Sequence, residues 1–267
     1  MNILELISAN KQSSVTIDKG ELISYIINSE EIIHQKGNPG WRNSDTEMFP
    51  LIGATSLNNF TVSTPRGDCK QDQHGLLREL EYTASNQTNT SASFQKKYLK
   101  NTLVKNSKYP DKSSVEFVSW PYDFKFNKHF KLSENGLQIT FSITAEQGMP
   151  FMLGYHPAFK LNGNKTEIIK TASSKITIDQ ILTIGSGAFP VLNTEEITLI
   201  KKNGLNVEIK TKGFQNFMLW TEVNNMLCIE PITFYPNLTK ECLAKEMFRK
   251  ANVIENFEVL ITPIQRT

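Results

Sequence analysis

Apolar and polar residues alternate along much of the chain with a period of two, which is the pattern of a half-buried β-strand. In residues 137–144 (LQITFSIT) every odd position is apolar and every even position is polar. The pair Asn135-Gly136 precedes this run and follows the short run 130–132. Both residue types tolerate the positive φ of a tight turn, so the pattern predicts a β-hairpin.

Two further hairpins and a C-terminal strand are predicted on the same grounds. Each hairpin joins two alternating runs across a turn that contains Asn-Gly or Asp-Lys-Gly. The segments are 197–202 with 205–210 across Asn203-Gly204, 15–17 with 21–27 across Asp18-Lys19-Gly20, and the run 257–264.

Amphipathic helices are scarce in this sequence. The best candidate covers 239–249 and ends in basic residues, as the C-terminus of a helix prefers. The polar stretches 83–93 and 161–165 are interpreted as loops or hairpin ends. Many short strands with turn signals between them indicate an all-β fold, a large antiparallel β-sandwich with few short helices. No linker or internal repeat marks a boundary, so residues 1–267 are expected to form one domain.

Composition narrows the classes of partner and compartment. The 29 basic and 27 acidic residues give a net charge of +2, which provides no reason to expect a nucleic-acid or membrane partner. No apolar run approaches the roughly 20 residues that span a bilayer, and the N-terminus lacks the pattern of a signal peptide. Cys69, Cys228 and Cys242 are odd in number and far apart, which favours reduced thiols in a cytoplasmic protein.

His156 has the most informative setting of the four histidines. It follows the apolar run 151–153 and Gly154, and Pro157 comes next. A proline disfavours the α region at the preceding residue and removes the next backbone donor, so the strand is expected to stop here. A polar ring held in extended geometry at the end of a core strand is well placed to face a cleft. His34 and His129 are interpreted as structural.

Glu230 repeats this construction, because it follows the apolar run 226–229 and precedes Pro231. A buried carboxylate is costly unless it is paired, and burial raises its pKa toward the range that suits a general base. A structural glutamate that accepts backbone hydrogen bonds is the alternative interpretation. The two residues together suggest an acid–base pair that faces one cleft across roughly the width of a pyranose ring.

Other chemistries find little support. The sequence holds no GxSxG, Walker, HExxH or strand-associated GxGxxG motif. The histidines and cysteines lack metal-ligand spacing, so neither a metal nor a cofactor is expected. The three tryptophans are interpreted as core or rim residues, although their faces would suit the C–H surface of a sugar; they are Trp41, Trp120 and Trp220.

Several motifs together resemble the aldose 1-epimerase (galactose mutarotase-like) family, especially its LacX-like branch. They occur in the order of that family and span nearly the whole chain. They are Gly20-Glu21-Leu22-Ile23-Ser24, Trp41-Arg42, Phe49-Pro50-Leu51-Ile52-Gly53, His74-Gly75-Leu76-Leu77-Arg78, Gly154-Tyr155-His156-Pro157-Ala158-Phe159, Leu219-Trp220-Thr221 and Cys228-Ile229-Glu230-Pro231.

The resemblance implies an isomerase that interconverts the α and β anomers of a free hexose. Glu230 would be the general base and His156 the general acid, while His74 and Arg78 would bind or line the sugar site. The need for a protonated histidine and an ionised glutamate predicts a bell-shaped pH dependence. Ala54 departs from the family pattern, because many members carry a sugar-binding arginine there.

Two other functions stay open at this point. One is a hexose-phosphate epimerase, which requires a basic phosphate pocket that the sequence does not identify. The other is a carbohydrate-binding module that kept the cleft and lost the chemistry, an idea that the change at Ala54 keeps open. Retention of both His156 and Glu230 argues against the module, and fold alone decides neither.

Overall fold

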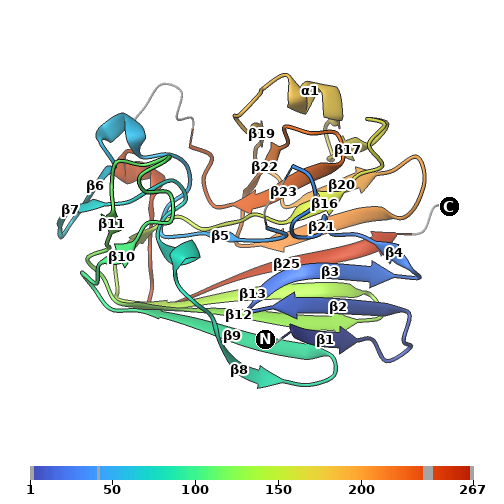
Figure 1. Ribbon diagram of the computed structural model, residues 1–267, viewed down its shortest axis with the longest axis horizontal. Coiled ribbons are helices and arrows are strands. Elements are labelled where there is room, and N and C mark those ends of the chain that lie inside the picture. Colours follow the sequence, from blue (N-terminus) through green and yellow to red (C-terminus); the bar gives the residue numbers. More distant parts are fainter. Residues whose placement is uncertain (1–2, 41–42, 237–242, 265–267) are drawn as a thin grey trace.

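Antiparallel strands build nearly all of the fold (Figure 1). The computed structural model describes residues 3–40, 43–236 and 243–264. Its largest sheet has nine strands. In sheet order they are β18 (Lys175–Thr177), β17 (Ile168–Lys170), β20 (Glu196–Ile200), β21 (Asn206–Lys212), β25 (Ile254–Ile264), β13 (Gly136–Ala145), β12 (Phe124–Ser133), β9 (Ser91–Tyr98) and β8 (Thr83–Gln87).

A six-stranded sheet lies above the central strands of the nine-stranded sheet in Figure 1. It contains β19 (Phe189–Val191), β22 (Asn216–Trp220), β23 (Met226–Ile232), β15 (Gly154–Tyr155) and β5 (Glu47–Met48), and β16 (Ala158–Lys160) also pairs with β23. A four-stranded sheet joins β1 (Ile3–Ile7), β2 (Ser13–Asp18), β3 (Glu21–Ile27) and β4 (Glu30–Glu31).

Small elements complete the described part of the chain. The two-stranded pairs are β6 (Thr61–Thr64) with β7 (Gly67–Lys70), β10 (Val104–Lys105) with β11 (Phe117–Val118), and β14 (Pro150–Phe151) with β24 (Arg249–Lys250). The helical elements are α1 (Ile178–Leu182) and the 3₁₀ turns η1 (Ser56–Asn58), η2 (Leu77–Glu79) and η3 (Lys245–Met247). The predicted all-β antiparallel fold with few short helices is confirmed.

The predicted hairpins are present, and each turn uses the residues that the sequence offered for it. Ser133 pairs with Gly136 between β12 and β13, and Asp18 pairs with Glu21 between β2 and β3. β20 and β21 also pair, across the turn that contains Gly204 at φ 89°. Alternate residues of β13 are buried along its length, as the period of two requires.

The helix predicted over 239–249 is wrong for the part that the structure describes. Residues 239–242 lie outside the described residues, and 243–249 hold only the 3₁₀ turn η3 and the start of β24. Ala244 is extended, with φ −85° and ψ 155°, so no helix runs through this residue into the 3₁₀ turn that follows it. The α-helix found among the described residues is α1. A capping box between Thr177 and Gln180 stabilises its N-terminus.

An aromatic core joins the large sheet to the six-stranded sheet. The ring centroid of Phe141 in β13 lies 5.1 Å from that of Tyr155 in β15. It lies 5.9 Å and 6.4 Å from the ring centroids of Phe126 and Phe214. All four side chains are fully buried. Because Tyr155 immediately precedes His156, this packing fixes the backbone that carries the histidine.

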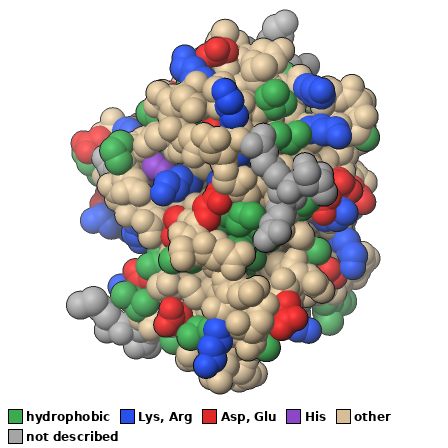
Figure 2. All heavy atoms as spheres, turned by 90° about the vertical axis from the view of Figure 1, so that its right-hand side faces the viewer, with side chains coloured by type: hydrophobic (Ala, Val, Ile, Leu, Met, Phe, Trp, Pro, Cys, Tyr) green, Lys and Arg blue, Asp and Glu red, His purple; other side chains and the backbone are tan. Residues whose placement is uncertain are grey.

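The surface mixes charges of both signs. On the face drawn in Figure 2, acidic and basic side chains are interspersed rather than gathered into one large patch of a single sign. The α-helix among the described residues has five residues, and none of the helices described there could cross a membrane.

We predict that Phe141→Ala lowers the free energy of unfolding by about 3–5 kcal/mol, because it removes a fully buried ring and leaves a cavity between the two sheets. Urea unfolding followed by circular dichroism measures the change. Phe117→Ala is the matched control, since Phe117 is 42% exposed, and it should change stability by less than about 0.5 kcal/mol. Equal effects of the two substitutions would contradict the assignment of Phe141 to the core.

Candidate active site

A cleft of about 1770 Å³ lies against the six-stranded sheet, and all four residues that the sequence singled out line it. Glu230 comes from β23 of that sheet and His156 from the link between β15 and β16, whereas His74 and Arg78 come from the segment around η2. Residues far apart in sequence therefore share one cavity. His34 and His129 are not among the residues that line it.

His156 occupies the break between two short strands. β15 ends at Tyr155 and β16 begins at Ala158, so His156 and Pro157 form the link between them. The backbone N–H of His156 donates to the carbonyl of Thr46 at 2.8 Å, which holds the link against residues 44–48. The predicted interruption at Pro157 is present, and the imidazole lies in the cleft.

Glu230 lies inside β23 rather than at the end of a strand, which corrects the interpretation from its proline. β23 continues through Pro231 to Ile232, and all seven of its residues are buried. The N–H groups of Ile229 and Thr233 face the 153–157 segment, where they donate to Pro157 and Leu153. The backbone nitrogen of Pro231, which has no hydrogen to donate, faces that same segment. The proline therefore removes no hydrogen bond between β23 and β22.

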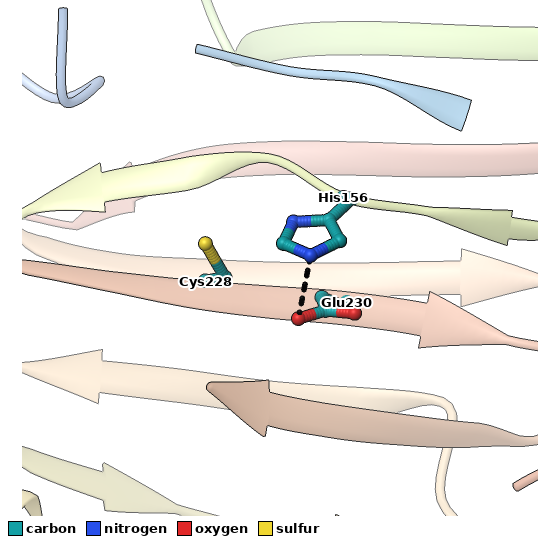
Figure 3. A group of neighbouring side chains, drawn as sticks. All are labelled: His156, Cys228 and Glu230. Atoms are coloured by element: carbon teal, nitrogen blue, oxygen red, sulfur yellow. Dashed lines mark ion pairs between the residues drawn. The ribbon is translucent and has the colours of Figure 1, made fainter. Parts of the chain in front are cut away.

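The two side chains meet directly. The His156 Nε2 atom lies 3.2 Å from the Glu230 Oε1 atom, and the two residues are only 6% and 2% exposed (Figure 3). The separation is shorter than the width of a pyranose ring that we expected. Two buried polar groups satisfy each other across a short distance, because leaving either alone would cost free energy.

Burial sets the protonation of this pair. Desolvation, assisted by the charge of Arg78, lowers the pKa of His156 to about 3. Desolvation raises the pKa of Glu230 well above its usual value. Both shifts favour the uncharged forms, in which the carboxyl group carries a proton that it can donate to the imidazole.

His74 is held in one tautomer by the backbone. Its Nδ1 atom accepts a hydrogen bond from the Gly53 N–H at 3.1 Å, which places the proton of the neutral ring on Nε2, and the Gln73 side-chain nitrogen lies 3.2 Å from that Nε2 atom. Desolvation, and secondly the charge of Arg78, lowers the pKa of His74 well below its usual value and keeps the ring neutral. The His74 ring stands edge-on to that of His156, with the centroids 6.0 Å apart.

Arg78 supplies a cation to the same side of the cleft. Its Nη2 atom donates to the Gln73 carbonyl at 2.7 Å, whereas its buried Nε atom finds no hydrogen-bond partner in the described part of the protein. Lys108 lies close by, where it donates to the Gln73 side chain at 3.0 Å and approaches Asp72 at 3.5 Å. Because Arg78 also lines the cleft, its guanidinium is a candidate binding group for a ligand.

The position of the missing arginine lies on the cleft wall. Ala54 lines the cavity, next to Gly53, which holds His74. Arg66 does not replace it, because its guanidinium is paired with Glu146 at 2.7 Å and packs over the ring of Tyr122, away from the cleft-lining residues. Arg42, another arginine in this part of the sequence, lies outside the described residues.

A buried ionic network backs the segment that holds His156. The Lys128 Nζ atom lies 2.6 Å from Asp45 and 2.7 Å from Glu47, and the Tyr155 hydroxyl donates to Asp45 at 2.7 Å. Burial lowers the pKa of Lys128 and the two carboxylates raise it, and the carboxylates prevail. The network ties residues 44–48 to β12 and β15, and so fixes the carbonyl that anchors His156.

Two more residues belong to the site. Trp220 lines the cleft and stands edge-on to His156 at 6.2 Å, so of the two positions expected for it, core or rim, it takes the rim. The spacing of Cys228 in the sequence suggests only a reduced thiol, yet its Sγ atom lies within 4.8 Å of ligand atoms of both His156 and Glu230. The period of two could have placed Cys228 beside Glu230, since the two are alternate residues of one strand.

Comparison with known proteins gives one family and several similar structures. A sequence model of the aldose 1-epimerase family matches residues 52–239, and no curated protein matches the chain. A galactose mutarotase-like protein from Lactobacillus casei ATCC 334 is 14% identical, with 98% of this chain and 100% of that chain covered and a TM-score of 0.79.

Two more solved structures share the fold. A galactose mutarotase related enzyme from Lactobacillus acidophilus is 17% identical, with 98% of each chain covered and a TM-score of 0.73. A galactose mutarotase-like protein from Clostridium acetobutylicum is 13% identical, with 100% of this chain and 99% of that chain covered and a TM-score of 0.62. At these identities the likeness shows the fold.

We predict that Glu230→Gln becomes more stable relative to the wild type as the pH rises. The unfolded chain loses the Glu230 proton above pH 4.5, whereas the folded protein keeps it because burial raises the pKa. The contribution of Glu230 to wild-type stability therefore falls by about 1.4 kcal/mol per pH unit until the folded pKa is reached, and glutamine abolishes that fall. Urea unfolding of both proteins between pH 5 and pH 8 measures the difference.

Glu146→Gln is the matched control for this measurement. The hydrogen bond from Arg66 lowers the pKa of Glu146, so that carboxylate is ionised in both states above pH 5 and its substitution should give a difference that does not change with pH. A difference for Glu230→Gln that is equally flat would show that Glu230 is ionised in the folded protein.

Proposed function

The chain belongs to the aldose 1-epimerase family, and we propose that it interconverts the α and β anomers of a free aldose by acid–base ring opening and reclosure. The observation that carries this proposal is the direct contact of a buried imidazole and a buried carboxyl group in the wall of one cleft. Anomer exchange needs only proton transfers at O1 and at the ring oxygen, so two such groups are sufficient for its chemistry.

In the proposed reaction Glu230 takes the proton of the C1 hydroxyl while His156 donates a proton to the ring oxygen. The bond between C1 and the ring oxygen breaks and leaves the open-chain aldehyde. Rotation about C1–C2 presents the other face of the carbonyl. Reclosure then returns the ring-oxygen proton to His156 and the Glu230 proton to O1, so the enzyme ends in its starting state.

The uncharged forms that burial favours correspond to one state of this cycle. After ring opening, the mechanism places a proton on Glu230 and leaves His156 neutral, which is the distribution that burial favours. The ion pair required for ring opening has the same number of protons. Sugar hydroxyl groups that enter the cleft would solvate that ion pair, so substrate itself shifts the proton toward the reactive form.

Three further residues are proposed to bind the sugar. The neutral His74 ring would donate its Nε2 proton, and Arg78 would donate from its guanidinium group. Trp220 would offer an apolar ring to the C–H face of the sugar. Ala54 contributes no hydrogen bond, so recognition at that wall depends on Arg78 more than in members that have an arginine there.

A hexose phosphate is the second candidate substrate. Arg78 and Lys108 line the same cleft. Arg78 donates to the backbone carbonyl of Gln73 and Lys108 donates to its side chain, so one residue brings the two cations together. Lys108 is already near Asp72. Of these two cations, Arg78 is therefore the one that has no carboxylate at salt-bridge distance among the described residues. The free sugar remains our proposal.

A cytoplasmic location is also proposed, on the basis of cysteine usage in the sequence.

We predict that Glu230→Gln and His156→Asn each reduce kcat by roughly 100- to 10,000-fold, the usual effect of removing a positioned base or acid. KM should change much less, because His74, Arg78 and Trp220 remain. Polarimetric mutarotation of a freshly dissolved hexose anomer measures both constants. His129→Asn is the control, since His129 bonds Ser93 on β9 and does not line the cleft. Wild-type turnover by either site variant would remove its assigned role.

A substrate panel separates the candidate functions. Free hexoses and their 6-phosphates are compared by polarimetric rates and by calorimetric binding, with Arg78→Ala beside the wild type. We predict catalysis of free hexose exchange, with KM raised about 10- to 150-fold in Arg78→Ala, the loss of one charge-assisted hydrogen bond. A tenfold preference for phosphates that Arg78→Ala abolishes would favour the phosphate epimerase. Binding without acceleration of exchange would favour a carbohydrate-binding module.

A further inference from the structure

Three different metal-binding groups converge at the wall of the cleft. The ligand atoms of His156, Cys228 and Glu230 all lie within 4.8 Å of one another, and all three residues are buried. Cys228 and Glu230 are alternate residues of β23, and their side chains extend toward the His156 ring (Figure 3). Two neighbouring strand segments thus bring one nitrogen, one sulfur and one oxygen donor to a common point.

We propose that these three residues form a binding site for Zn²⁺, and that zinc bound there inhibits the protein. The metal would coordinate the imidazole nitrogen, the Cys228 thiolate and a Glu230 carboxylate oxygen. Those are the imidazole and the carboxylate that the proposed anomer exchange requires, so bound zinc and acid–base catalysis exclude each other.

The geometry needs only a small closure to suit zinc. Zinc binds imidazole, thiolate and carboxylate at about 2.0–2.3 Å, which places tetrahedral ligand atoms roughly 3.3–3.8 Å apart. The His156 Nε2 and Glu230 Oε1 atoms are already 3.2 Å apart, and no pair of ligand atoms exceeds 4.8 Å. A change of about 1 Å in one side chain therefore closes the set, and β23 fixes the backbone of two of the three ligands.

Charge and softness select the metal. The thiolate and the carboxylate carry one negative charge each and the imidazole is neutral, so a divalent cation gives a complex with no net charge, which tolerates burial. Ca²⁺ and Mg²⁺ prefer six or more oxygen ligands, and the thiolate favours softer metals. Zinc accepts this mixed ligand set.

Access to the site is from the cleft. His156 and Glu230 line the cavity, whereas Cys228 is not among the lining residues and lies behind them. An entering Zn²⁺ would first meet the histidine and the glutamate and then displace the proton of the thiol. Three protein ligands leave the fourth tetrahedral position for a water molecule on the cleft side.

Zinc binding is independent of the proposed function, and only the inhibition depends on it. The direct test is competition of the protein against a chromophoric zinc chelator, together with absorption spectra of the protein loaded with Co²⁺. We expect one zinc ion per chain and a thiolate-to-cobalt charge-transfer band in the near ultraviolet. Cys242→Ala is the background for all variants, because Cys242 lies outside the described residues and its thiol could also bind zinc.

Cys228→Ala and Cys228→Ser remove the thiol with little change in volume, and either should weaken zinc binding at least tenfold and abolish the charge-transfer band. Cys69→Ala is the matched control, because Cys69 is also a buried free cysteine but lies on β7, outside the cluster. It should bind zinc as the background protein does. Unchanged binding in both Cys228 variants, or a band that persists in them, would overturn the site.

The inhibition is measured by polarimetry on the same proteins, each relative to its own rate without zinc. Zinc should stop anomer exchange by the background protein, chelator should restore it, and the Cys228 variants should need at least tenfold more zinc for the same inhibition. Zinc that binds through Cys228 without slowing exchange would refute the inhibition. If the metal-free protein shows no exchange, the proposed function fails, while the spectra still decide whether the metal site exists.

Discussion

A carboxyl group buried within a completely buried strand is the constraint on which the site depends. Glu230 lies in the middle of β23, with Met218 opposite it in β22 and the 153–157 segment on the other side. Such a group has to be protonated or paired. The His156 imidazole, 3.2 Å away, can accept a hydrogen bond from the protonated carboxyl group or pair with the ionised one. The same burial that makes the pair costly for folding gives it the pKa shifts on which its proposed chemistry depends.

The surrounding architecture keeps the imidazole in position against that carboxyl group. Lys128, which reaches in from β12, is neutralised by Asp45 and Glu47, and the segment that carries these acids accepts the backbone hydrogen bond of His156. Breaking a buried ion pair of this kind leaves an uncompensated charge, so the network resists displacement. The nine-stranded sheet thus orients a residue of the six-stranded sheet through one lysine side chain.

Local patterns in the sequence predicted what local physics determines. Alternation fixed β13 and β25, and turn residues such as Gly136 and Gly20 fixed the hairpins, because one buried face and one permissive turn define the register. The prolines after His156 and Glu230 identified both residues, although only the first marks a break in a strand. The ionic network was not predictable, because Asp45 and Tyr155 are 110 residues apart and Asp45 has no distinctive neighbourhood. The roles of His74 and Arg78 came from family resemblance and remain proposals.

The central claim is that His156 and Glu230 share one proton, which rests on the carboxyl group in the sugar-free protein and moves when sugar binds. Infrared difference spectroscopy between the wild type and Glu230→Gln at neutral pH tests it most directly. We expect the C=O stretch of a protonated carboxylic acid in the free wild-type protein, absent from the variant and diminished when a hexose saturates the wild type. Carboxylate bands alone in the free wild-type protein would contradict the account.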